Sequence, residues 1–276
     1  MPIPDLSNSL FVAKLRHIQS IHEPALWRGP DTLVRYFLPL RERVRAAWIS
    51  ESKLSRLRAE PFYYYLIART QYYDQAFIGA VSDGVERILI VGCGSDTRAY
   101  RFKNLLGNGR IKVLECDQAE LIYKRRRIVK RWHDVACVEH LAIDLNDGRW
   151  PELEQWLGNP PGAKTLVLME GVSPYIDSES FVRFLQLLGA KLTAESQVVY
   201  DYKIAGVDDR FVRTGRAAEA FRLSGGRSEA ARFHERWGLH LEDLELSSEL
   251  HLRLLPNESS HALFEGDVLV RLSVKR

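Results

Sequence analysis

Two glycines and an acid stand in this sequence at a spacing that suits the binding of a nucleoside. Gly92 and Gly94 follow the apolar run 88–91, and Asp117 stands 23 residues after Gly94, at the end of a second run. A glycine turn at a strand end brings free backbone N–H groups close to a ligand. A carboxylate about 20 residues further on is placed to accept hydrogen bonds from a ribose diol. These residues predict a site for a nucleoside-containing cofactor.

The residues within the turn distinguish between two such cofactors. A dinucleotide site has a third glycine near position 97, so that a helix packs closely beside the pyrophosphate. This chain has Thr97 there, preceded by Ser95 and Asp96, either of which can cap a helix that starts near Thr97. An acid is a poor neighbour for a pyrophosphate, but it is compatible with a cofactor that carries an ammonium group. The turn therefore favours S-adenosylmethionine over NAD(P).

Short strands of a parallel sheet are the elements that must position these residues. The runs 88–91 and 165–169 are continuous and apolar, which is typical of strands buried on both faces. The pattern therefore predicts an α/β fold with a mostly parallel central sheet and helices on both faces. Further strands are expected at 111–116, 139–143 and 198–202, and antiparallel closing strands are expected at 266–274 and in the apolar segment before it.

Three acids each follow one of these strands, namely Asp117, Asp144 and Glu170. In open α/β sheets, ligands bind outside the carboxyl ends of the strands, so we expect all three on one rim, facing a positively charged cofactor. Asp144 is placed there to accept a hydrogen bond from an adenine amino group, with Leu145 beside the ring. A role as a helix cap is the alternative for Asp144.

Composition sets bounds on the function. The 276 residues are 46% hydrophobic and 27% charged, which is ordinary for a soluble globular protein with one large α/β domain. A net charge of +3 does not indicate a nucleic-acid partner, and a solvated helix face accounts for the basic run at 124–131. No apolar run approaches the roughly 20 residues of a membrane span, and no signal peptide is recognised. We expect a cytoplasmic protein without a membrane partner, in which Cys93, Cys116 and Cys137 are reduced core thiols.

Five motifs, in order, resemble those of the leucine carboxyl methyltransferase family of S-adenosylmethionine-dependent enzymes. The family signature GxGxDTxxxR is similar to GCGSDTRAYR at 92–101, and its R-T/A-xxx-D element is similar to Arg69-Thr70 with Asp74. The resemblance extends over about residues 60–205. The other matches are ECDQ at 115–118 (with Gln118-Ala119 where proline is usual), IDL at 143–145 and EGVSPYI at 170–176.

The resemblance implies a Rossmann-like class I methyltransferase fold, with S-adenosylmethionine as the cofactor and no metal. It also assigns cofactor contacts, because the motif positions match residue by residue. The cofactor-binding residues that it implies are Arg69, Gly92, Gly94, Asp96, Thr97, Asp117, Gln118, Asp144, Leu145 and Glu170.

Arg69 lies in an apolar, tyrosine-rich stretch, where a guanidinium is costly unless an anion pairs with it. The resemblance implies that Arg69 grips the methionine carboxylate of the cofactor, and an ion pair with Asp74 is the alternative. The aromatic residues at 62–77 are singly expected in the core. As a group they suggest an apolar acceptor.

We expect two parts in the chain: a helical N-terminal cap at 1–80 and a Rossmann-like domain at 81–276, with a helical insert at about 206–236. The first sixty residues carry ten Lys or Arg against six Asp or Glu, with apolar residues at helical spacing. A solvated cap over the sheet edge is the simpler interpretation of this region. The family resemblance favours a lid over the active site. Residues 206–236 are rich in Arg and Gly with helical stretches, and we expect this insert to form part of the substrate wall.

Methyl transfer to a carboxylate is the reaction that the resemblance favours. The expected acceptor is a small, natural-product-like acid, whose carboxylate is ionised near neutral pH and needs no general base. A second hypothesis is an O-methyltransferase of secondary metabolism that acts on a phenol or hydroxyl and uses a base. In that case Tyr175 is the first candidate for the catalytic base, and His133 and His140 are the other candidates. A third is a non-catalytic S-adenosylmethionine-binding protein, and a fourth is an NAD(P)-dependent oxidoreductase, which the missing third glycine disfavours.

Overall fold

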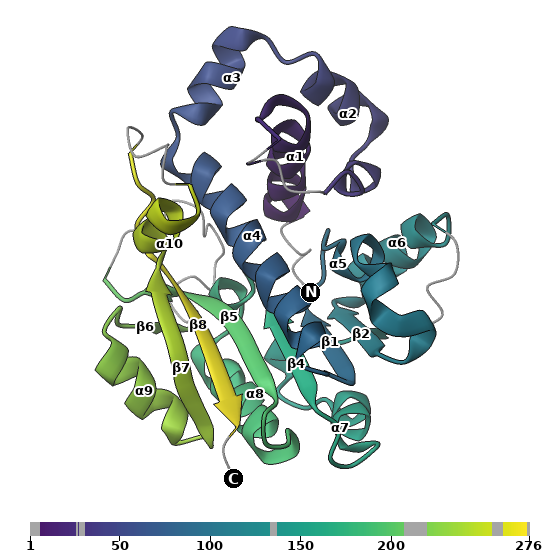
Figure 1. The fold of residues 1–276 in the computed structure, drawn as a ribbon, viewed down its shortest axis with the longest axis vertical. Helices are drawn as coiled ribbons and strands as arrows, with labels where there is room; N and C mark the ends of the chain where they lie inside the picture. Colours follow the sequence, from purple (N-terminus) through teal and green to yellow (C-terminus); the bar gives the residue numbers. More distant parts are fainter. Residues whose placement is uncertain are drawn as a thin grey trace.

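The computed structural model describes residues 6–25, 27, 31–132, 137–206, 220–255 and 262–274, and an eight-stranded sheet forms its centre (Figure 1). Seven strands lie in the order β3-β2-β1-β4-β5-β8-β7, and the short β6 pairs with β5. Every pairing among β1 to β6 is parallel, whereas β8 is antiparallel to β5 and β7. The mostly parallel sheet and its antiparallel closing strands are thus confirmed. The strands are β1 Arg87–Val91, β2 Lys112–Asp117, β3 Val138–Ala142, β4 Thr165–Met169, β5 Gln197–Ile204, β6 Arg222–Leu223, β7 Leu239–Leu246 and β8 Asp267–Val274.

The observed strand bounds differ little from the predicted ones. β4 covers the predicted run 165–169, and β1 and β2 differ from their predicted runs by one residue at the ends. β3 lies one residue earlier than predicted, because β2 ends at Asp117 and pairs with β3 only as far as Ala142. Asp144 therefore lies two residues beyond its strand. The carboxyl ends of these parallel strands still face one rim, as the site requires.

Helices cover both faces of the sheet, and the two faces have separate cores. Successive residues of β1 point to opposite faces, so that Ile88 and Ile90 belong to the core beneath α4 (Pro61–Ser82). Leu89 and Val91 belong to the core beneath the helices on the other face. Those helices are α7 Pro151–Gly158, α8 Ser178–Lys191 and α9 Arg227–Glu235.

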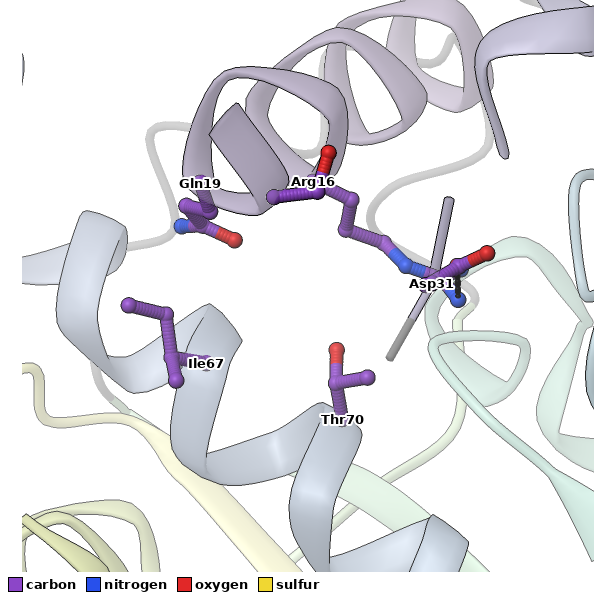
Figure 2. A pocket seen from close by; sticks show the side chains of 6 residues that line it. Arg16, Gln19, Asp31, Ile67 and Thr70 are labelled. Carbon is purple, nitrogen blue, oxygen red and sulfur yellow. Dashed lines mark hydrogen bonds and ion pairs between the residues drawn. The ribbon is translucent and has the colours of Figure 1, made fainter. Parts of the chain in front are cut away.

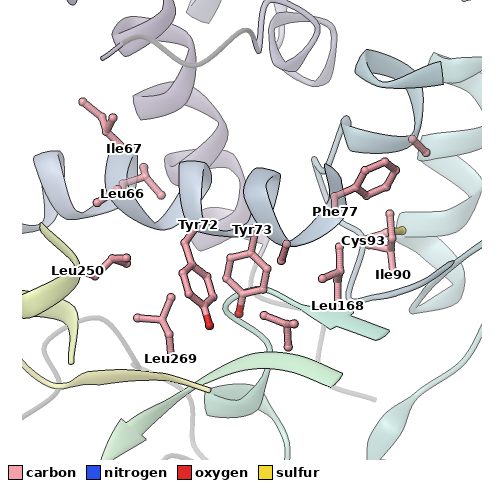
Figure 3. Packing of buried hydrophobic residues seen from close by; sticks show 14 of the residues in the cluster. Leu66, Ile67, Tyr72, Tyr73, Phe77, Ile90, Cys93, Leu168, Leu250 and Leu269 are labelled. Atoms are coloured by element: carbon pink, nitrogen blue, oxygen red, sulfur yellow. The ribbon is translucent and has the colours of Figure 1, made fainter. Parts of the chain in front are cut away.

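The helix α4 crosses the sheet and is apolar on nearly all sides, which is typical of a buried helix (Figure 3). Its first residue is Pro61, a position where proline loses no helical hydrogen bond. Tyr72 and Tyr73 pack with Leu168 and Leu269 of the sheet in one cluster. The tyrosines and phenylalanines at 62–77 are therefore core residues, as each was singly expected. Because these side chains are committed to the core, their composition no longer supports an apolar acceptor.

The described N-terminal part of the chain consists of short helices joined by loops and lies above α4 (Figure 1). The notion that this part moves as a lid remains a prediction. Its elements are α1 Leu6–His22, η1 Val34–Phe37, α2 Leu40–Ala47 and α3 Glu51–Arg58.

The predicted helical insert at 206–236 is described only in part. Residues 207–219 lie outside the described residues. The described remainder contains the short strand β6 as well as α9, which begins directly after Gly226. No helix in the described ranges has the length and apolar character that crossing a membrane demands. The remaining helices are α5 Arg98–Arg101, η2 Lys103–Gly109, α6 Ala119–Val129, η3 Leu145–Asp147, η4 Ser173–Tyr175 and α10 Ser247–Leu254.

Candidate functional site

The glycine turn directly follows β1, and both of its glycines have positive φ. Gly92 has φ +63° and Gly94 has φ +35°. A Cβ on Gly92 would lie 2.4 Å from Cγ2 of Val172, in the loop after β4. Any other residue at position 92 would therefore meet both backbone strain and a clash. The turn leads through Thr97 into the single-turn helix α5, and the Asp96 carboxylate accepts a hydrogen bond from the Arg98 N–H at 2.7 Å, as predicted for a capping acid.

Asp117 lies beside the turn and binds it directly. Its Oδ2 accepts a hydrogen bond from the Gly94 N–H at 2.7 Å, and its Oδ1 accepts one from the Gln118 N–H at 2.8 Å. Burial raises the pKa of the Asp117 carboxyl, although both N–H groups act to lower it. Each carboxylate oxygen keeps a second lone pair, so Asp117 can still accept from a ribose diol. The structure thus brings together the turn and the acid that the sequence paired by spacing.

Asp144 and Leu145 begin the short helix η3 on the same rim. The Asp144 Oδ1 accepts a hydrogen bond from the Asn146 N–H at 2.9 Å, so its side chain does cap this helix. Its Oδ2 lies 3.5 Å from Nε2 of Gln118, which links it to the neighbouring strand end. Leu145 is buried in the core beneath α7 and α8. The cap alternative is therefore realised, and contact of Asp144 with an adenine remains a prediction.

Glu170, at the end of β4, lies between two guanidinium groups. Its Oε2 is 2.8 Å from Nη2 of Arg98, and its Oε1 is 3.3 Å from Nε of Arg69. Burial would raise the pKa of the Glu170 carboxyl, but Arg98 and Arg69 together hold it at about 2. Glu170 is therefore an ionised member of an ion-pair network and does not face the rim as an isolated charge.

Arg69 does not form the alternative ion pair with Asp74. Five positions along an α-helix turn the side chain through about 500°, so residues 69 and 74 point to different sides of α4. Besides Glu170, the Nη1 of Arg69 lies 3.9 Å from carboxylate oxygens of Asp201 and of Asp267. Its Nε has no hydrogen bond of good geometry within the described part of the chain. The guanidinium is thus held by charge more than by hydrogen bonds, and an added anion would share it with three acids.

Asp74 instead anchors the arginines of the signature motif. Its Oδ1 accepts a hydrogen bond from Nε of Arg98 at 2.8 Å, and both of its oxygens accept from Arg101 at 2.7 and 2.8 Å. Nη1 of Arg98 also donates to the Asp96 carboxylate at 2.5 Å. Asp96, predicted as a cofactor contact, therefore already has an internal partner.

Asp31 joins the N-terminal cap to the turn, and sequence reasoning missed it. Its Oδ1 accepts a hydrogen bond from the Thr97 hydroxyl at 2.6 Å, and its Oδ2 pairs with Arg16 of α1. Burial would raise the pKa of the Asp31 carboxyl, but Arg16 and Arg101 more than offset this and lower it. Asp31 stands in a loop without apolar periodicity, so the sequence carries no local signal for this role.

Within the described part of the chain, these contacts form one continuous ion-pair network of six acids and five bases. It runs from α1 through the turn and α4 to the far strands, where Lys203 pairs with Asp267 at 2.5 Å. Burial raises the pKa of the Asp201 carboxyl, against the lowering effect of Arg69. With every member ionised, the network has a net charge of −1. Its members are Asp31, Asp74, Asp96, Glu170, Asp201, Asp267, Arg16, Arg69, Arg98, Arg101 and Lys203.

A pocket lies between α1 and α4 at the edge of this network. Figure 2 shows Arg16 reaching from α1 toward Asp31, with Ile67 and Thr70 of α4 on the opposite side. The Thr70 carbonyl accepts a hydrogen bond from Nη2 of Arg98 at 3.3 Å, so the pocket borders the arginine that holds Glu170. Gln19 and Ser20 complete its lining.

The candidates for a general base are dispersed. Tyr175, in η4, is 41% exposed, and its carbonyl accepts a hydrogen bond from the Asn146 side chain at 3.3 Å. The Nε2 of His140 lies 3.1 Å from Oε2 of Glu115, which is fully buried. His133 lies outside the described residues. A catalytic role for Tyr175 remains a prediction.

The prediction of a solvated basic face on α6 is wrong for one residue. Arg125 is 1% exposed, because it pairs with the buried Glu115 of β2 and with carbonyl groups of the turn. The cysteines at 93, 116 and 137 are free and buried, as predicted.

The glycine turn, the acids on one rim and the sheet order together define a class I methyltransferase-type α/β fold. A family model described as leucine carboxyl methyltransferase matches residues 9–189, which is more than half of the chain. The chain belongs to the leucine carboxyl methyltransferase family. The predicted resemblance is thus confirmed, and with it S-adenosylmethionine as the cofactor of the family.

Relatives in actinobacteria support this assignment. A protein of Mycolicibacterium paratuberculosis, provisionally named as an S-adenosyl-L-methionine-dependent methyltransferase, is 30% identical over 196 residues, or 66% of this chain. A Frankia alni protein with the same kind of name is 27% identical over 72% of this chain and 69% of its own length. The matched region spans only 61% of the Mycolicibacterium protein and 45% of a Mycobacterium avium relative.

Solved structures confirm the fold. A protein of Thermobifida fusca, provisionally named as a methyltransferase, superposes with a TM-score of 0.60 over all of this chain and 99% of its own, at 13% identity. A DUF574 family protein of Streptomyces avermitilis gives a TM-score of 0.57 over 95% of this chain and 97% of its own, also at 13% identity. At such identity the likeness establishes the fold and nothing about the acceptor.

Proposed function

We propose that this protein is an S-adenosylmethionine-dependent O-methyltransferase that converts the carboxylate of a small-molecule acceptor to a methyl ester. The observation that carries the proposal is the rim itself: a glycine turn bound to Asp117 lies beside a buried network of net charge −1. S-adenosylmethionine combines a ribose diol with a methionine end of net positive charge. The two parts of the rim match these two parts of the cofactor.

At the adenosine end, Asp117 would accept from the ribose hydroxyl groups, and Gln118 lies beside it. Asp144 and Leu145 would contact the adenine from the next strand end. At the methionine end, the Nη donors of Arg69 would hold the carboxylate group. The acids of the network would offset the charges of the ammonium and the sulfonium.

When bound, S-adenosylmethionine supplies a methyl group on a positively charged sulfur. The acceptor carboxylate oxygen forms the new bond to that carbon as the carbon–sulfur bond breaks, and sulfur keeps the electron pair, so no proton moves. The task left to the protein is to hold the reacting atoms in line at about 3–3.5 Å and to exclude water. A buried network that fixes Glu170 and Arg69 suits this task. The proposed reaction uses a small-molecule acceptor and involves neither a nucleic acid nor a membrane.

Isothermal titration tests the cofactor assignment. The parent protein should bind S-adenosylmethionine and S-adenosylhomocysteine, and Asp117→Ala should weaken both by about a hundredfold, because hydrogen bonds of charged groups contribute about 1.5–3 kcal/mol each. Asp147→Ala, on the same rim but outside the proposed contacts, is the matched control. Tight NADH binding without a response to S-adenosylmethionine would overturn the proposal.

A labelling experiment tests the acceptor chemistry. The protein is incubated with methyl-labelled S-adenosylmethionine and a metabolite extract, and the product is then treated with base. A methyl ester releases the label as methanol. A base-stable label would reject the ester and indicate an ether or an amine, whereas binding without any turnover would favour a non-catalytic role.

A further inference from the structure

Arg125 of α6 reaches beneath the glycine turn, where all three nitrogens of its guanidinium have hydrogen-bond partners. Its Nη1 donates to the Gly94 carbonyl at 3.0 Å and to the Cys93 carbonyl at 3.4 Å, while its Nη2 donates to the Asp96 carbonyl at 2.6 Å. Its Nε donates to Glu115 at 2.5 Å, and Nη2 also pairs with that carboxylate. Because Arg125 is 1% exposed, it lies behind the turn and does not line the rim.

The turn is consequently gripped at both polar groups of Gly94. Its N–H donates to Asp117 and its C=O accepts from Arg125, and these two partners lie in β2 and in α6, which follows it. The E-x-D element thereby has two distinct tasks. Glu115 neutralises the arginine beneath the turn, and Asp117 fixes the amide on its side.

The carbonyl contacts of Arg125 also set the direction of two N–H groups. In a trans peptide unit the C=O and the N–H point in opposite directions, and the peptide bonds of the turn are trans. The carbonyls of Gly94 and Asp96 point toward Arg125, so the N–H groups of Ser95 and Thr97 point away from it. Neither N–H has a hydrogen-bond partner in the described ranges. Buried N–H groups rarely lack a partner, and the described residues supply none for these two.

We propose that Arg125 is a positioning residue that aims the N–H group of Ser95 at an oxygen of the bound cofactor, whereas the N–H of Thr97, which is 0% exposed, stays inside the protein. This inference rests on the proposed function for the identity of the ligand, which is S-adenosylmethionine or its demethylated product. It adds a buried arginine and one backbone donor to the site. The planar fork of arginine is essential, because one group must bind a carboxylate and three carbonyls at once.

Arg125→Lys is the decisive variant, because it keeps a positive charge for Glu115 but loses the fork. We expect its dissociation constant for S-adenosylhomocysteine to rise about ten- to a hundredfold in isothermal titration. Tyr100→Phe is the matched control, because the Tyr100 hydroxyl donates to Glu115 at 2.9 Å and makes no contact with the turn. It should lower the melting temperature while leaving the affinity within about twofold of the parent.

NMR signals of the backbone amides distinguish a role of Arg125 in positioning the turn from a role in stability alone. In ¹⁵N-labelled protein without ligand, the Ser95 and Thr97 amide resonances should shift in Arg125→Lys and stay in place in Tyr100→Phe. In the parent protein, the Ser95 resonance should shift again when S-adenosylhomocysteine is added. Arg125→Lys with parental affinity and unmoved Ser95 and Thr97 signals would overturn the inference. A parent protein that fails to bind S-adenosylhomocysteine would instead refute the proposed function, and the ligand-free comparison would still decide what Arg125 does to the turn.

Discussion

The two ends of the candidate cofactor site are built in different ways. At the adenosine end, Asp117 and Asp144 bind N–H groups of residues close to them in space and mostly in sequence. At the methionine end, Glu170 belongs to a network whose members lie between residues 16 and 267. Local capping orients the first set of acids, whereas only the complete fold orients the second. In the proposed site, the methionine end would therefore combine ligand contacts with the stability of the fold, and the adenosine end would do so much less.

The largest expected effect comes from breaking the network at its centre. Arg98 is fully buried and pairs with three acids, so Arg98→Met leaves Asp74, Asp96 and Glu170 without that partner. We expect a loss of about 3–5 kcal/mol in the free energy of unfolding, measured by urea denaturation. Asp144→Ala, at the adenosine end, removes a helix cap and should cost about 1 kcal/mol. Similar losses from the two variants would contradict the contrast between the ends.

The two ends should also respond in opposite ways to acid. The pKa of Glu170 falls from 4.5 to about 2 on folding, so the stability it contributes is present above pH 4.5 and is lost as the pH falls toward 2. That loss amounts to about 3 kcal/mol. Burial raises the pKa of Asp117, so its contribution has the other sign and is lost as the pH rises through its folded-state pKa.

Urea unfolding between pH 7 and pH 3 measures this difference. Glu170→Gln should flatten the decline of stability with acid, even if its stability at pH 7 is lower than that of the parent. The exposed Glu120→Gln, on α6, is the control and should leave the pH dependence unchanged. A parental slope in Glu170→Gln would show that Arg98 and Arg69 do not hold this carboxylate ionised.

These contrasts explain how much of the site was predictable from the sequence. Asp117 was predictable because its spacing from Gly94 and its place at a strand end are both local features. Asp31 and Asp267 were not, because Asp31 reaches Thr97, and Asp267 reaches Arg69 and Lys203, across more than sixty residues of sequence. Arg98 stood within the matched motif, yet its role depends on acids from three separate elements. No short-range pattern encodes such a contact.

The fold shows the same limit. The strand β4 was predicted to the residue, because a buried parallel strand is a continuous apolar run with clear ends. The strand β6 was not predicted, because its two residues are too few to show a period and pair with β5 only in the folded chain. Arg125 was misjudged because a basic run looks solvated when its counter-ion, Glu115, lies on another element.

A smaller effect is expected when Arg69 is replaced and the affinities for two ligands, one with and one without the amino-acid part, are compared. Arg69→Ala should raise the dissociation constant for S-adenosylmethionine about ten- to a hundredfold, because it removes a charged hydrogen-bond donor. Methylthioadenosine lacks the amino-acid part, so its affinity should change by less than about twofold. Arg69→Lys should show an intermediate loss for S-adenosylmethionine. Equal losses for both ligands, with a lower melting temperature, would mean that Arg69 only holds the three surrounding acids in place.

The smallest expected effect is the response of the chemical step to pH. A carboxylate acceptor titrates near pH 4, so its reactive form dominates from about pH 6 to 9, and neither end of the site needs to supply a base. The rate constant of a single turnover with saturating ligands should therefore be nearly flat over that range, and single-turnover conditions prevent product release from masking it. Tyr175→Phe should leave this profile unchanged. A phenol acceptor with a pKa near 10 would instead give a rate that climbs by up to tenfold per pH unit. Such a climb would reject the carboxylate acceptor, and a profile that depends on Tyr175 would place a general base in η4, after β4.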